Sequence, residues 1–201
     1  MSRRNAPEVN AGSMADIAFL LLIFFLVTTT IETDQGINRK LPPMDPPDDE
    51  DVQIKEKNIF TVLVNRNDQL LVEDNLMELR DLREAAIAFL DNGGDGSCKY
   101  CQGANDPTSS DNPEKAVISL QNDAETSYGA YISVQNELVA AYYFLRDREC
   151  KARHGKTYRE LEAMFDDPKT PEKVKNRLEP MLKEIQEMYP QKLSEAEPKR
   201  N

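Results

Sequence analysis

One carboxylate stands at the head of a long apolar run near the N-terminus. Asp16 is followed by eleven uninterrupted apolar residues, Ile17–Val27. A charged carboxylate within hydrocarbon costs on the order of 2.5–3.5 kcal/mol, so such acids usually face a protein interior and handle ions or protons. The other interpretation is a capping box from Ser13 to Asp16, which places the acid among the lipid headgroups. Asp16 is therefore either a proton-coupling residue or part of a helix cap.

The apolar run is too short to span a bilayer by itself and has the length of a signal-peptide core. Counted over residues 12–32, however, it gives a helix of about 20 residues, or roughly 30 Å. Thr28, Thr29 and Thr30 follow the core, where a signal peptidase requires small residues. The sequence therefore favours an uncleaved transmembrane helix. The threonines either line a polar path or hydrogen-bond to their own helix carbonyls.

Charges on either side of this segment predict its orientation. Arg3 and Arg4 precede it, and Glu32 and Asp34 follow it directly. Because cationic residues stay in the cytoplasm, residues 1–11 are expected there and the rest of the chain is exported. In a Gram-negative cell this is a single-pass protein of the inner membrane with a periplasmic C-terminal domain.

The sulfur-bearing residues are the second candidate for chemistry. Cys98 and Cys101 form a C-x-x-C motif in a Gly- and Asp-rich loop. In thioredoxin-like enzymes the C-x-x-C motif lies at the start of a helix, so its position here disfavours thiol catalysis. Cys150 and His154 are expected near the same end of the domain, so the four residues can be arranged as a zinc set. In an oxidising compartment a disulfide, Cys98–Cys101 or Cys101–Cys150, is the default. Unpaired thiols are the remaining alternative.

Composition narrows the classes of function. The 201 residues carry a formal net charge of -11, which argues against binding to nucleic acid, whose phosphates select basic surfaces. A single histidine leaves little material for a histidine-based active site. We expect no enzyme and no cofactor.

A proline-rich segment follows the predicted membrane helix and connects it to the rest of the chain. Residues 33–57 contain four prolines and an acidic block, and they predict an extended tether. Within it, Ile37 to Leu41 can pair as a strand with a partner before Pro42 stops it.

A small α+β domain is predicted over residues 58–150 from alternating and helical apolar patterns. The expected elements, in chain order, are strands 58–65 and 69–72 as a hairpin, helix 78–91, strand 115–121 and helix 127–151. Residues 93–114 form an insertion that contains the C-x-x-C motif. Residues 151–201 add charged helices, one of them capped by Thr170, and a possible final edge strand over 191–196.

Three segments resemble the ExbD/TolR family, whose members have one membrane helix, a tether and a small periplasmic β-β-α-β-α-β domain. The segments are "MADIAFLLLIFFLVTTT" with Asp16, "GINRKLPP" from Gly36 to Pro43, and "ISLQNDAETSYG" from Ile118 to Gly129. The insertion and the C-terminal helices exceed the family pattern.

The resemblance implies a role and partners. It implies a homodimer that works with an ExbB-like polytopic membrane protein and a TonB-like protein, with Asp16 taking up and releasing protons that drive outer-membrane uptake. A TolR-like subunit for envelope maintenance is the alternative within the family. Outside it, the alternative is a membrane-anchored periplasmic thiol or metal protein in which Asp16 is only a cap.

Overall fold

A computed structural model describes residues 11–28 and 55–196, which belong to two separate compact units. The described part of the first unit is one helix, α1, Ala11–Thr28. Ser13 is its third residue, so Ser13 lies inside the helix and the predicted capping box with Asp16 is wrong. Among the described residues, no helix combines the length and the apolar character that crossing a membrane requires. The predicted span over residues 12–32 is thus not confirmed, and its last four residues lie outside the described part.

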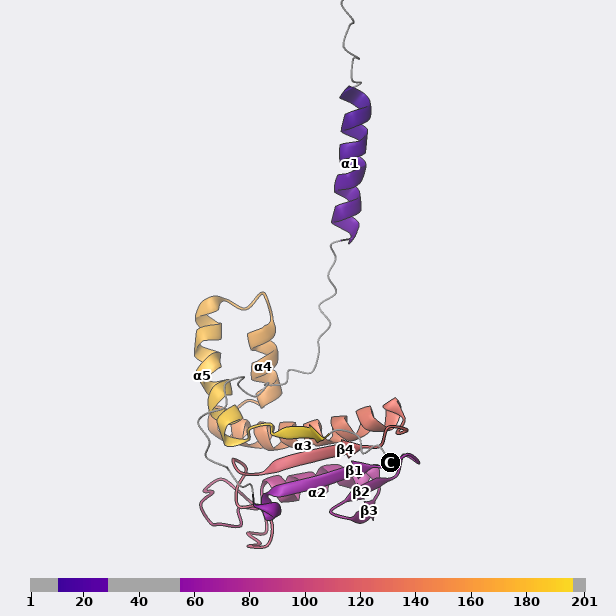
Figure 1. Ribbon diagram of the computed structural model, residues 1–201. Coiled ribbons are helices and arrows are strands. Elements are labelled where there is room, and N and C mark those ends of the chain that lie inside the picture. Colours follow the sequence, from indigo (N-terminus) through magenta and orange to yellow (C-terminus); the bar gives the residue numbers. More distant parts are fainter. Residues whose placement is uncertain (1–10, 29–54, 197–201) are drawn as a thin grey trace, which may run out of the picture. The chain divides into compact units, whose positions relative to one another are not determined.

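The C-terminal unit is built on a five-stranded sheet with the order β3-β2-β1-β4-β5, which confirms the mixed α+β class (Figure 1). Its elements are η1 Glu56–Asn58, β1 Ile59–Val64, β2 Leu70–Val72, β3 Asn75–Met77, α2 Leu79–Leu90, β4 Val117–Asn122, α3 Tyr128–His154, α4 Tyr158–Asp166, α5 Glu172–Met188 and β5 Leu193–Ala196.

One face of the sheet is covered by helices. Burial alternates along β1, where Phe60, Val62 and Val64 are buried and the residues between them are only half-buried. The covering helices α2 and α3 lie side by side along the sheet (Figure 1). A strand with this period-2 pattern buries one face and leaves the other more open. The core therefore lies between the sheet and these two helices.

Strand directions explain why the insertion lies where it does. β1 and β4 are parallel, with Ile59 opposite Val117 and Val64 opposite Asn122. Parallel neighbours need a long crossover, which α2 and residues 91–116 supply here. The insertion thus runs from the end of α2 to the start of β4.

Strand β3 is absent from the elements expected from sequence. It pairs antiparallel to β2 through a two-residue turn at Glu73 and Asp74, whose φ angles are 49° and 63°. Such turns normally contain Asn or Gly, because those residues tolerate positive φ. A Glu-Asp pair gives no such signal, so the short strand beyond it was missed.

The C-terminal helices pack onto the end of α3. α4 begins with a capping box between Thr157 and Glu160, and α5 contains Pro180. The N-cap of α5 is Pro171, and no side chain caps it, so the predicted Thr170 cap is wrong. β5 lies within the segment where the sequence indicates an edge strand, and it runs parallel to β4.

Candidate functional site

Asp16 is the sixth residue of α1 and the only charged residue in this helix. It lies five residues beyond Ala11, or about 7.5 Å along the helix axis. Phe19 and Leu20, one turn further along the same face, are 60% and 59% exposed. Asp16 is exposed as well, and it carries the one charge of an otherwise uncharged helix.

Most of the other residues predicted near the membrane lie beyond the described part of the chain. Thr28 is the last residue of α1, whereas Thr29 and Thr30 are outside the described residues. The predicted partner-binding strand, with Ile37, Leu41 and Pro42, is outside them as well.

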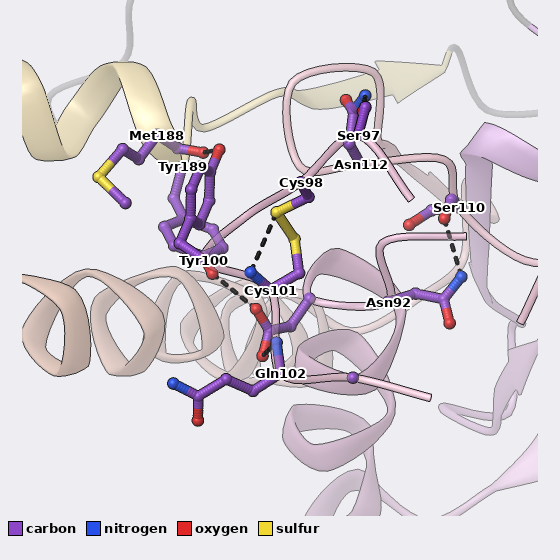
Figure 2. The surroundings of a disulfide bond; sticks show 12 residues. Asn92, Ser97, Cys98, Tyr100, Cys101, Gln102, Ser110, Asn112, Met188 and Tyr189 are labelled. Atoms are coloured by element: carbon purple, nitrogen blue, oxygen red, sulfur yellow. Dashed lines mark hydrogen bonds between the residues drawn. A yellow bond between two sulfur atoms is a disulfide. The ribbon is translucent and has the colours of Figure 1, made fainter. Parts of the chain in front are cut away.

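The C-x-x-C motif is closed by a disulfide between Cys98 and Cys101, whose Cα atoms are 5.5 Å apart (Figure 2). Both residues are half-buried. Cys150 is a free and fully buried thiol on α3. Burial, with smaller contributions from neighbouring carboxylates, raises the pKa of Cys150 to about 11. This thiol is protonated at neutral pH and is a poor nucleophile.

The zinc set considered from sequence is not assembled in the structure. Two of its four members are joined as the disulfide, and no group of three or more metal-binding side chains occurs among residues 11–28 and 55–196. His154 Nε2 lies 3.4 Å from Glu184 Oε2, but without the geometry of a hydrogen bond.

A partly buried ion pair beside the disulfide was not anticipated from the sequence. Arg148 on α3 donates two hydrogen bonds to the carboxylate of Asp91, with Nη1 to Oδ2 at 2.6 Å and Nη2 to Oδ1 at 2.9 Å. The hydroxyl of Tyr189 donates to Asp91 Oδ1 at 2.6 Å. Hydrogen bonding to Asp91 raises the pKa of Arg148, while burial and the same carboxylate raise the pKa of Tyr189. The three side chains join α2, α3 and the end of α5.

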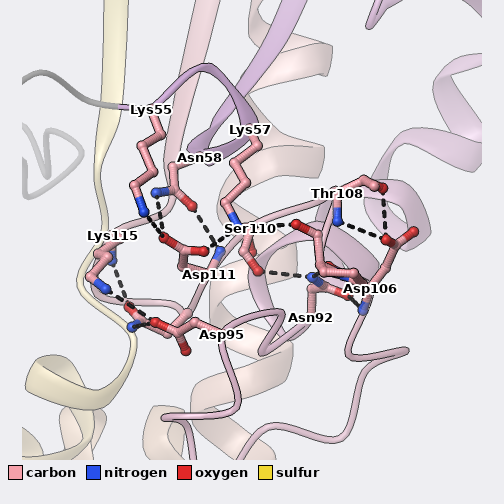
Figure 3. A network of polar contacts seen from close by, with 12 residues as sticks. Lys55, Lys57, Asn58, Asn92, Asp95, Asp106, Thr108, Ser110, Asp111 and Lys115 are labelled. Carbon is pink, nitrogen blue, oxygen red and sulfur yellow. Dashed lines mark hydrogen bonds and ion pairs between the residues drawn. The ribbon is translucent and has the colours of Figure 1, made fainter.

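The insertion is held to the sheet by a second polar network (Figure 3). Asp111 is buried, accepts a hydrogen bond of 3.2 Å from Asn58 Nδ2, and forms ion pairs with Lys57 and Lys55. The contact with Lys57 makes the largest contribution to lowering the pKa of Asp111. Asn92 Nδ2 donates to the carbonyl of Ser110 at 2.8 Å. The insertion is thus a folded part of the C-terminal unit.

A groove of about 580 Å³ opens beside β3. Leu70, Met77 and Val134 line its apolar wall, and the strand at its rim presents Leu76 with 71% of its surface exposed. β3 is also an edge strand, because among residues 55–196 only β2 pairs with its backbone. Edge strands with an adjoining apolar groove suit the binding of an extended peptide.

Comparison with known proteins identifies the class. The model of the family described as biopolymer transport protein ExbD/TolR matches residues 2–144. The chain therefore belongs to the ExbD/TolR family. No curated protein matches it significantly. The matched range includes α1, the strands β1 to β4, α2 and the insertion, and it ends within α3, before α4, α5 and β5.

Family membership carries a coarse function. ExbD/TolR proteins are energy-transducing subunits of biopolymer transport and are anchored in the inner membrane. They are accessory proteins without enzymatic activity, and they generally act with ExbB-like and TonB-like partners.

Proposed function

We propose that this chain is the proton-responsive subunit of an ExbB-ExbD-TonB type inner-membrane motor that powers outer-membrane uptake. The observation that carries the proposal is one carboxylate, Asp16, on an otherwise apolar helix within the part of the chain that matches the family. In this proposal residues 12–32, which include most of α1, are the membrane anchor. Residues 1–11 are cytoplasmic, and the C-terminal unit is periplasmic.

The proposed chemistry is a change of charge in a low-dielectric setting. A carboxyl group surrounded by hydrocarbon favours its neutral form, whereas the charged form requires a polar partner. When Asp16 gains or loses a proton, α1 would therefore favour a different surface of the neighbouring subunit. Such a change biases a two-state arrangement of the helices, and the bias is the source of mechanical work. Thr28, Thr29 and Thr30 would extend the polar path.

The C-terminal unit supplies the surface through which motion reaches a partner. A homodimer within an ExbB-like ring would present two such units to a TonB-like protein. Support comes from the open edge of β3 and the apolar groove beside it. The segment Ile37 to Pro42 is a second proposed partner-binding strand.

Co-purification tests this function. The full chain, extracted in detergent from its own cells, should bring down a polytopic membrane protein, and deletion of residues 12–32 should abolish this association. A TonB-like protein in the same complex would assign the uptake role, and a Tol-type partner would assign envelope maintenance. Recovery of the chain without any polytopic partner would contradict both.

A further inference from the structure

The disulfide closes a turn that joins two distant parts of the C-terminal unit. Tyr100 lies inside the Cys98–Cys101 ring, and its hydroxyl donates a hydrogen bond of 2.8 Å to the carbonyl of Met188 at the end of α5 (Figure 2). The Tyr100 ring also makes an edge-to-face contact with Tyr189, with 5.4 Å between the ring centroids. The turn thus fastens the insertion to the point where the chain leaves α5 for β5.

The other side of the turn is fixed to the end of α2. The amides of Gln102 and Gly103 donate to Asp91, at 3.2 Å to Oδ2 and 3.0 Å to the carbonyl. Cys101 packs so closely on Gly93 that a side-chain carbon at Gly93 would lie 3.1 Å from Cys101 Cβ. Cys101 is therefore held in place by its neighbours along the chain.

Reduction of the Cys98–Cys101 disulfide would disturb the side of the turn that carries Cys98 and Tyr100. Two thiol sulfurs cannot remain at the bonded distance of about 2 Å, so they must move apart. Because the amides of Gln102 and Gly103 tie the chain directly after Cys101 to Asp91, we expect the movement to fall mainly on Cys98 and on Tyr100. The hydrogen bond from Tyr100 to Met188 depends on the position of that ring.

We propose that the Cys98–Cys101 disulfide is a redox latch, opened by a protein dithiol of the thioredoxin class, and that opening it releases Tyr100 from Met188 and Tyr189. The compartment in which the latch operates rests on the proposed function, which places the C-terminal unit in the periplasm. The reaction itself rests only on the described residues.

The dithiol donor supplies the two electrons that reduction of the Cys98–Cys101 disulfide requires. A donor thiolate forms a bond to Cys101 Sγ, and the bond between the two cysteines breaks with Cys98 Sγ leaving as a thiolate that takes up a proton. The amide of Cys101 donates a hydrogen bond of 3.1 Å to Cys98 Sγ, which stabilises this leaving group. The second donor thiol then displaces Cys101, so two electrons and two protons pass to the chain and the donor becomes a disulfide. Cys150, which is fully buried, takes no part.

Hydrogen–deuterium exchange on the purified full chain in detergent tests the latch. After treatment with reduced thioredoxin, native alkylation should add two labels, and the amides of residues 97–103 and 188–193 should exchange at least about threefold faster. Residues 59–64 in β1 should be unchanged, and reoxidation should restore slow exchange. A disulfide that thioredoxin leaves intact would overturn the proposal, as would unchanged exchange over 188–193 once both thiols are labelled.

Matched variants separate the latch from general loosening. Tyr100→Phe keeps the disulfide but removes the donor to Met188, so its oxidised form should already exchange faster over 188–193, and reduction should add little. Cys150→Ala, which removes the third thiol without burying a hydroxyl, should keep the redox response of the natural chain, and loss of that response in this variant would also refute the latch. Energised transport does not enter these measurements, so the latch and the proposed function can each fail alone.

Discussion

At the residue scale, the most informative positions in the C-terminal unit are two buried carboxylates. Asp91 and Asp111 are 3% and 2% exposed, and each is matched by cations from a different part of the chain. A buried charge that loses its partner destabilises the folded state. Each carboxylate therefore helps to hold the insertion in the position where its cationic partners lie.

Replacing Asp91 by Asn should lower the free energy of unfolding by about 3 kcal/mol, because Arg148 would lose its two-pronged ion pair and its ion pairing would be reduced to the contact of its Nε with Glu149. The control is Glu137→Gln, which breaks the more exposed pair with Arg83 and should cost less than about 1 kcal/mol. Chemical denaturation of both variants measures the difference. Equal losses would show that burial of the Asp91 pair has no energetic consequence.

Asp111 should make the unit sensitive to acid. Its pKa is lowered in the folded state, mainly by Lys57, so its contribution to stability is complete above the unfolded pKa of about 3.9 and is lost as the pH falls through the folded value. The Asp111→Asn variant should be less stable at pH 7 and lose less between pH 5 and pH 2. Asp74→Asn, at an exposed turn, should follow the natural chain. An unchanged acid response in Asp111→Asn would contradict this assignment.

At the element scale, sequence patterns predicted some elements much better than others. Alternation along β1 and helical spacing along α3 are local signals, and Gly155 with φ of 74° explains why α3 continues to His154, three residues past its expected end. The capping box of Thr157 and Glu160 at the start of α4 has a local sequence signal too, but it was not among the predictions.

The parts that escaped prediction depend on contacts between distant residues. Nothing local to Arg148 or Asp91 indicates that they meet, because 57 positions separate them and the fold alone brings them together. Asp16 was readable because its apolar surroundings are local in sequence. The spacing of residues along the sequence does not show which distant residues meet in the fold.

The open edge of β3 should be a binding surface for the TonB-like partner. Leu76→Glu would place a charge at an apolar rim that is 71% exposed, so binding should weaken at least about tenfold while the melting temperature changes little. Val174→Glu, on a partly exposed residue of α5 away from the groove, is the control. Pull-down and calorimetry on the full chain report both quantities. Undiminished binding by Leu76→Glu would place the partner elsewhere.

At the scale of the whole molecule, the chain combines a helix with one acid and a separate α+β unit that carries an insertion and additional C-terminal helices. The family match ends at residue 144, within α3, so α4, α5 and β5 lie beyond the matched range. The ion pair of Arg148 and Asp91, which Tyr189 joins, and the turn around Tyr100 connect the end of α5 to α2 and α3. The proposed coupling of protons to work belongs to the other unit, at Asp16 on α1.

Energised uptake in cells that carry Asp16→Asn in place of the natural chain tests that claim most directly. The amide keeps the size of the side chain but has no proton to exchange, so uptake should fall to the level of a deletion strain while the variant still co-purifies with its polytopic partner. Asp16→Glu, which keeps the carboxyl group, should retain part of the activity. Near-normal uptake by Asp16→Asn would contradict the account.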